Sequence, residues 1–361
     1  MDQPQAGPVA AHGRQIAVLY AIFLVSGFCG LIYESIWSHY LKLLLGHAAY
    51  AQAVVLVVFV GGLAAGASIA GRFSERIRQP VLWYAAIEAL VAVMAFAFRG
   101  VFESVSARST SYFLPAFCGD GGGACSAGWL VAAALILPPS ILLGTTFPLM
   151  SAGVIRLGVA PGRGLSLLYF LNSTGAAFGV LASGFLLIPA LGLPGTILLA
   201  GCCNVAVALA AWLTVRASGR DTTAPQALPS RPQPAVAPGE LRLLLAVAAL
   251  TGLSSFIYEV VWIRMLSLVL GAATHAFELM LAPFILGLAI GAWWIRNRID
   301  TSRDAMLLLA RIRSPWACSR SPRCRCTPAC TTRWPSLCRR WCATRPATCC
   351  STSPAAPWPR P

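Results

Sequence analysis

Residues 27–67 read GFCGLIYESIWSHYLKLLLGHAAYAQAVVLVVFVGGLAAGA, and residues 252–292 read GLSSFIYEVVWIRMLSLVLGAATHAFELMLAPFILGLAIGA. The two stretches align without a gap, with Tyr, Glu and Trp in register and with matching glycines. Apolar composition alone does not produce such a match. The chain therefore contains an internal repeat, and each copy is long enough for about two apolar spans.

Long apolar segments extend on both sides of each copy. A helix that crosses a bilayer needs about 20 consecutive apolar residues. Eight segments reach or approach this length, and they predict an all-α, polytopic transmembrane bundle of about eight spans: 16–36, 48–70, 81–98, 129–150, 165–191, 195–215, 243–263 and 272–295.

The composition agrees with this fold class. Hydrophobic residues make up 57% of the 361 residues and charged residues only 11%, whereas soluble domains carry about 25% charged residues. The net charge of +15 would suit a nucleic-acid-binding protein, but the long uncharged runs exclude that class. We expect the bilayer, and no nucleic acid, as a partner.

The repeat also predicts how the spans are arranged. Six spans separate the first copy from the second, so both copies cross the membrane in the same direction. This parallel repeat is typical of six-plus-six transporters, whose halves face each other around a central site. We divide the chain into a six-helix bundle (1–215), a Pro-rich cytoplasmic linker (216–240) and two spans of a second bundle (241–312).

The basic residues predict the orientation, because cytoplasmic loops are enriched in Lys and Arg. A cytoplasmic N-terminus places fourteen of the basic residues before Arg313 inside and only Lys42, Arg99, Arg108 and Arg264 outside. The first span lacks a cleavage signature and is predicted to be a retained helix. Cys118 and Cys125 lie in the long outer loop, where they either form a disulfide or remain two thiols.

Residues 313–361 have a different composition from the rest of the chain. They contain nine Arg and eight Cys but no Gly, Val or acidic residue. GC-rich coding DNA gives such a composition when it is read out of frame, and a one-nucleotide shift can restore an apolar span. The alternative is a Cys-rich module, although the CxxC pairs of a zinc site are absent. We expect an out-of-frame, disordered tail and a truncated chain.

Glu34 and Glu259 are the main candidates for a binding site, because a carboxylate inside a span is a functional-site hypothesis by default. A cationic amine would suit them through ion pairing and through cation–π attraction to aromatic rings. The proposed substrate-binding residues are Glu34, Glu259, Tyr33, Tyr258, Trp37 and Trp262. The alternative is an aromatic belt at the membrane surface, with each Glu reaching water or a nearby basic residue.

Two further acidic residues lie inside spans. Glu88 is either a proton-coupling carboxylate or part of a hydrogen bond between helices. Glu278 and His275 share one helical face and suit a shared metal or proton, or simply structural pairing. We predict no catalytic residue, no cofactor-binding residue and no metal site in this chain.

Several motifs resemble one protein family in the order of that family. They are GLIYE followed by Trp37, the stretch LLGTTFPLM at 142–150, and GRGLSLLYFLNSTGAAFGVLASGFLLIPALGLPGT at 162–196. They resemble the major-facilitator-like membrane portion of bacterial fused spermidine synthases, over about residues 15–312. The resemblance implies a multi-pass protein of the bacterial inner membrane that moves or delivers a polyamine or another small cation.

The resemblance also supplies an alternative function. Members of the family commonly carry a soluble aminopropyltransferase domain, which binds decarboxylated S-adenosylmethionine and a polyamine. Nothing in this chain matches that domain, so the chain has no complete catalytic centre of its own. The alternative is therefore a membrane anchor for an aminopropyltransferase whose catalytic domain is missing here.

Overall fold

We analysed a computed structural model, which describes residues 8–45, 48–74, 76–108, 126–217, 238–271, 273–301 and 308. The chain divides into two compact units, Met1–Thr301 and Ser302–Pro361. Of the second unit the structure describes only residue 308. The predictions for the linker core, for Cys118 and Cys125, and for the tail 313–361 therefore lie outside the described residues.

The described part of the first unit is helical and contains no strand. This confirms the all-α prediction. The helices, in chain order, are α1 (Pro8–Leu45), α2 (Ala48–Phe73), α3 (Pro80–Arg108), α5 (Ser126–Arg156), α6 (Pro161–Ala182), the π-helical turn η2 (Ser183–Leu187), α7 (Ile188–Ala217), α8 (Pro238–Leu270) and α9 (Ala273–Ile295).

Seven helical stretches of the described chain are long and apolar enough to cross a membrane. One of them, Pro161–Ala217, has 57 residues and would measure about 85 Å if it were straight, against a hydrocarbon core of about 30 Å. It reverses direction at Gly192, which has φ 69° and ψ 174°. This conformation suits glycine because it lacks a Cβ. The predicted division between spans 165–191 and 195–215 falls at this turn.

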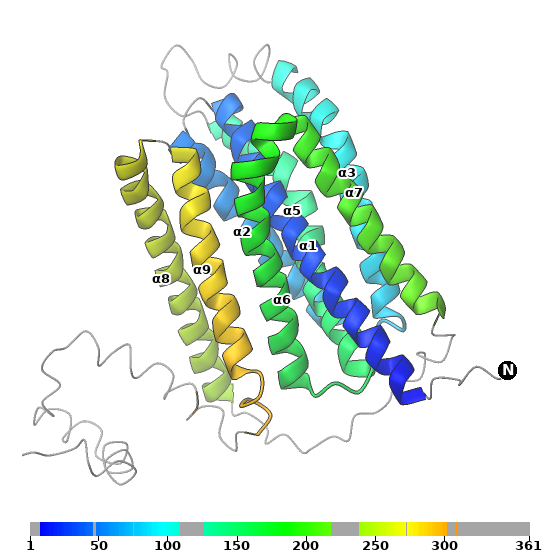
Figure 1. The fold of residues 1–361 in the computed structure, drawn as a ribbon. Helices are drawn as coiled ribbons and strands as arrows, with labels where there is room; N and C mark the ends of the chain where they lie inside the picture. Colours follow the sequence, from blue (N-terminus) through cyan, green and yellow to red (C-terminus); the bar gives the residue numbers. More distant parts are fainter. Residues whose placement is uncertain are drawn as a thin grey trace, which may run out of the picture. The chain divides into compact units, whose positions relative to one another are not determined.

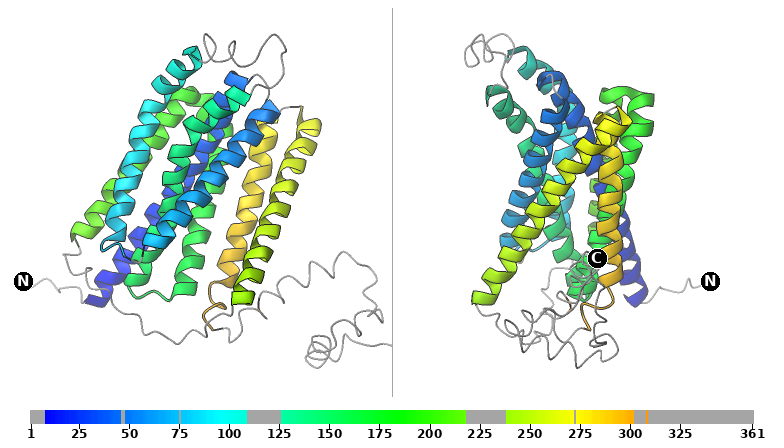
Figure 2. Two further views of the ribbon diagram at one scale, coloured as in Figure 1. Left: turned by 180° about the vertical axis from the view of Figure 1, so that it is seen from behind. Right: turned by 90° about the vertical axis from the view of Figure 1, so that its left-hand side faces the viewer.

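The first six spans pack as a bundle of helices (Figures 1 and 2), and their pairing is symmetric. The most extensive pairs are α2 with α5, α1 with α6 and α3 with α7. An exchange of the first three spans with the next three replaces α1 by α5, α2 by α6 and α3 by α7. The pair α1–α6 then becomes the pair α5–α2, and the pair α3–α7 is unchanged. The bundle therefore consists of two three-helix halves, as in the nested repeats of many transporters.

Small residues allow the closest of these contacts. A Cβ added to Gly66 of α2 would overlap the backbone of Ile141 in α5, and a Cβ added to Gly175 of α6 would overlap the backbone of Leu24 in α1. Helices in a membrane associate through such close approaches, because burial from lipid provides no hydrophobic driving force.

Helices α8 and α9 pack against each other and attach to the first bundle mainly through α6 and α9. Both carboxylate oxygens of Asp300, just beyond α9, accept hydrogen bonds at the N-terminus of α6. The backbone N–H of Gly162 donates to Oδ1 at 3.0 Å, and that of Arg163 donates to Oδ2 at 2.7 Å. An acidic group at this position compensates the helix dipole.

The two copies of the repeat run in the same direction, since α1 and α8 start at the same end of the bundle (Figure 1). Helices α2 and α9 return in the opposite direction. Four described basic residues, Lys42, Arg99, Arg108 and Arg264, lie towards the end where α1 and α8 finish. The other described basic residues gather at the end where α1 and α8 begin. The two predicted sets of basic residues thus occupy opposite ends of the bundle.

Candidate functional site

Glu34 in α1 and Glu259 in α8 are both buried. Glu34 is 2% exposed and Glu259 is 6% exposed, and the charge of Glu259 acts on the Glu34 carboxyl. One turn away from each, Leu31 and Ile263 pack against the same apolar cluster. The two glutamates that the repeat makes equivalent therefore lie within electrostatic range of each other.

The described residues supply no ion-pair partner to either glutamate. Oε1 of each is buried without a hydrogen-bond partner, and among the described side chains no Lys or Arg forms an ion pair with them. A charged group at the centre of a membrane costs at least about 2.5 kcal/mol. Two neighbouring carboxylates therefore require a proton or an external cation.

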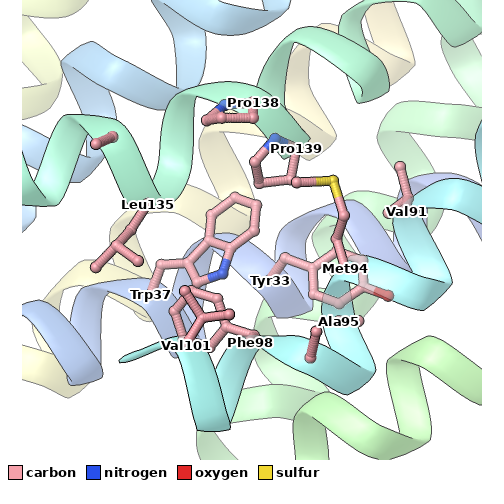
Figure 3. Close-up of a pocket in the computed structure, with 12 residues that line it drawn as sticks. Tyr33, Trp37, Val91, Met94, Ala95, Phe98, Val101, Leu135, Pro138 and Pro139 are labelled. Atoms are coloured by element: carbon pink, nitrogen blue, oxygen red, sulfur yellow. The ribbon is translucent and has the colours of Figure 1, made fainter. Parts of the chain in front are cut away.

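The aromatic residues of the first copy lie on a different side of α1. Tyr33 and Trp37 are stacked, with ring centroids 5.7 Å apart. They line a pocket of about 210 Å³ between α1, α3 and α5. Figure 3 shows their rings among apolar side chains that include Met94, Ala95 and Phe98. None of the residues that line this pocket is charged.

The aromatic residues of the second copy are exposed. Tyr258 is 49% exposed and Trp262 is 57% exposed, whereas their equivalents Tyr33 and Trp37 are 1% and 3% exposed. In the first copy, α3 and α5 cover these positions. The aromatic residues of the two copies thus have different surroundings, and their role beside Glu34 and Glu259 stays a prediction.

Glu88 of α3 is completely buried inside the first bundle. Its Oε1 accepts a hydrogen bond from Ser26 Oγ of α1 at 2.5 Å, and its Oε2 accepts one from Asn204 Nδ2 of α7 at 2.8 Å. These contacts link three helices, as the hydrogen-bonding alternative for Glu88 anticipates. The proton-coupling role of Glu88 stays a prediction.

Glu278 of α9 forms a polar junction with α1 and η2. Its Oε1 accepts a hydrogen bond from Ser35 Oγ at 3.1 Å, and its Oε2 lies 3.2 Å from His275 Nδ1. A Cβ added to Gly184 of η2 would overlap the carboxyl group. Among the described residues, no group of three or more His, Cys, Asp or Glu could hold a metal ion.

Sequence reasoning missed Ser35 and Gly184 as members of this junction. Ser35 lies 243 residues before Glu278, and Gly184 is one glycine among many. The available signal was the polar side chain of Ser35 directly after Glu34, since a polar residue inside a span commonly forms a bond between helices.

A comparison with curated proteins gave one relative. A polyamine aminopropyltransferase of Oceanobacillus iheyensis is 25% identical over 196 residues, which cover 54% of this chain and 35% of that protein. The matched part of the chain thus spans about a third of the curated relative's length. No family model matches the chain, and no solved structure matches it.

Proposed function

We propose that the chain is the transporter-like membrane part of a polyamine-handling protein, and that Glu34 and Glu259 bind a cationic amine between the two repeat copies. The observation that carries this proposal is the pair of buried carboxyls within electrostatic range of each other, to which the described residues supply no ion-pair partner. A polyamine supplies several positive charges on one flexible chain, so it can neutralise both carboxylates at once.

The helix arrangement supports a transporter more than a simple anchor. The first six spans form two three-helix halves, and the repeat begins a second bundle in parallel with the first. The packing agrees with the proposed major-facilitator-like architecture, in which residues 1–215 form one half and residues 241–312 begin the other. A site between the halves is the usual place for a transported substrate.

The open packing positions of α8 and α9 support a second bundle. In the first copy, Gly27 is covered by Asn172 of α6, and Gly66 is covered by α5. Their repeat equivalents, Gly252 and Gly291, would meet nothing described within 4 Å. The second copy therefore carries the same packing positions without the helices that fill them in the first.

The proposal includes the bacterial inner membrane, with the N-terminus in the cytoplasm. The support is the gathering of the described basic residues at the end where α1 and α8 begin, as expected for cytoplasmic loops. The relative that carries a polyamine aminopropyltransferase name supports polyamine as the substrate class.

The second candidate function is a membrane anchor for an aminopropyltransferase. The printed name of the relative favours it, because that name describes an enzyme rather than a transporter. An anchor needs apolar helices but no buried, unpaired carboxyls. The pair Glu34 and Glu259 is therefore the feature that separates the two functions.

Uptake by proteoliposomes distinguishes them. We expect vesicles that contain the purified chain to accumulate labelled spermidine faster than empty vesicles, and an excess of unlabelled spermidine to suppress this uptake. Vesicles that contain the Glu34→Gln/Glu259→Gln variant are the matched control and should behave like empty vesicles. Equal uptake by empty and protein-containing vesicles would favour the anchor.

A further inference from the structure

At the junction around Glu278, a buried carboxyl lies beside a half-exposed histidine. His275 lies in the first turn of α9 with its side chain 50% exposed, and Glu278 lies one turn deeper with its side chain 0% exposed. His275 Nδ1 and Glu278 Oε2 are 3.2 Å apart. The histidine therefore stands between the end of the bundle and a carboxyl that has no access of its own.

The packing around this pair fixes its geometry. The π-helical turn η2 places Gly184 against the Glu278 carboxyl, where any side chain would collide with it. The next residue, Phe185, stacks on the His275 ring with centroids 5.1 Å apart. Such π-helical turns are frequent at functional sites, and this one leaves room for the carboxyl while it orients the imidazole.

The titratable groups around Glu278 are histidines, a side chain that can gain or lose a proton near neutral pH. The titratable groups that act on it are His275 of its own helix and His39 of α1. Helix α6 carries Arg163 at its far end and Tyr169, and α2 carries Arg72, also at its far end. Among the described side chains, α8 carries Arg242, Glu259 and Arg264, and α1 carries Arg14, Glu34 and Lys42 besides His39. Apart from His39, none of these is among the groups that act on Glu278. Since no Lys or Arg in the described part of these helices neutralises Glu278, its charge depends on protons.

The repeat argues against a merely structural pair. The equivalents of Glu278 and His275 in the first copy are Ala53 and Tyr50, and α1 and α2 pack together without an acid–histidine pair at these positions. A feature present in only one copy is not required to hold such a helix pair together.

We propose that His275 and Glu278 form a proton-uptake site at the junction of α1, η2 and α9. A hydronium ion from the aqueous side donates a proton to His275 Nε2 and leaves as water, and the proton on Nδ1 passes to Glu278 Oε2. The imidazole ends neutral with its proton on Nε2, and the carboxylate becomes a carboxylic acid that Ser35 continues to hold. Chains of acidic residues and histidines are the usual proton relays of transporters. The coupling of this proton to amine movement rests on the proposed function.

Infrared spectroscopy of the chain in lipid nanodiscs tests the site. We expect one carboxylic-acid band to grow as the pH is lowered, to shift promptly in heavy water, and to disappear in Glu278→Gln, which keeps the side-chain shape. His275→Phe should retain the band and slow its exchange by at least about tenfold, as expected when a proton shuttle is removed.

Glu88 provides the internal comparison, because it is buried among Ser26 and Asn204 without a histidine beside it. The band lost in Glu88→Gln should exchange at the same rate with and without His275. The proposal is overturned if Glu278→Gln removes no pH-dependent band, or if His275→Phe exchanges at the wild-type rate. The measurement uses no amine, so a failure to take up spermidine would refute the proposed function and leave this result unchanged.

Discussion

Replacing Glu34 or Glu259 with Gln is expected to weaken spermidine binding by at least about 30-fold, and replacing both is expected to abolish it. Gln keeps the size of the side chain but removes the negative charge. The loss of one partner from a buried charge pair costs about 2 kcal/mol or more, and each 1.4 kcal/mol is about a tenfold change in affinity. Equilibrium dialysis with labelled spermidine and the purified chain in nanodiscs measures the effect.

The matched control for this change is Glu103→Gln. Glu103 is exposed and pairs with Arg99 at 2.8 Å, away from the two repeat glutamates. Exposed pairs contribute little, so this variant should bind spermidine with wild-type affinity. Unchanged affinity in the double variant would show that the two carboxyls do not bind the amine.

Replacing Gly66 with Ala is expected to destabilise the first bundle by about 1–3 kcal/mol or more. The added Cβ would overlap the backbone oxygen of Ile141 in α5, and a backbone in a packed helix cannot move aside as a flexible side chain can. Helices α2 and α5 form the most extensive contact in the structure. Thermal unfolding in detergent should show a lower midpoint.

Gly291→Ala is the matched control, because Gly291 is the repeat equivalent of Gly66 in the same small-residue pattern. An added Cβ at Gly291 meets nothing described within 4 Å, so the midpoint should stay close to that of the wild type. A loss as large as that of Gly66→Ala would contradict the open face that the structure gives to α9.

The fold could be predicted because a bilayer imposes a length on each helix. The runs of apolar residues located the spans, and the break between the predicted spans 165–191 and 195–215 falls at Gly192, where α6 and α7 reverse direction. The repeat predicted the common direction of α1 and α8. The pairing of the helices could not be predicted, because almost every face of these helices is apolar and periodicity does not distinguish a partner from lipid.

The candidate site could be predicted only in part, and the reason is helix geometry. Tyr33, Glu34 and Trp37 are close in sequence, but neighbouring residues of an α-helix point about 100° apart. The rings therefore enter the pocket between α1, α3 and α5, while the carboxyl of Glu34 interacts with Glu259. A box of conspicuous residues in one segment need not form one site.

The residues of the junction at Glu278, in contrast, are far apart in sequence and form one site. Its members come from three distant segments, and each alone has an ordinary role in a membrane helix. Ser35 is one of many small polar residues, and Gly184 is one of 32 glycines. Only the docking of α9 against α6 and α1 brings them together, and that docking depends on the shapes of all three helices.

The measurement that tests the central claim most directly is a thermal-unfolding cycle in nanodiscs, with and without spermidine, on the wild type, Glu34→Gln, Glu259→Gln and the double variant. A ligand that binds the folded state raises the midpoint. The account predicts a clear rise for the wild type, a smaller rise for each single variant and none for the double variant. It also predicts that the two losses are not additive, because both carboxyls hold one ligand. An equal rise in all four proteins would contradict it.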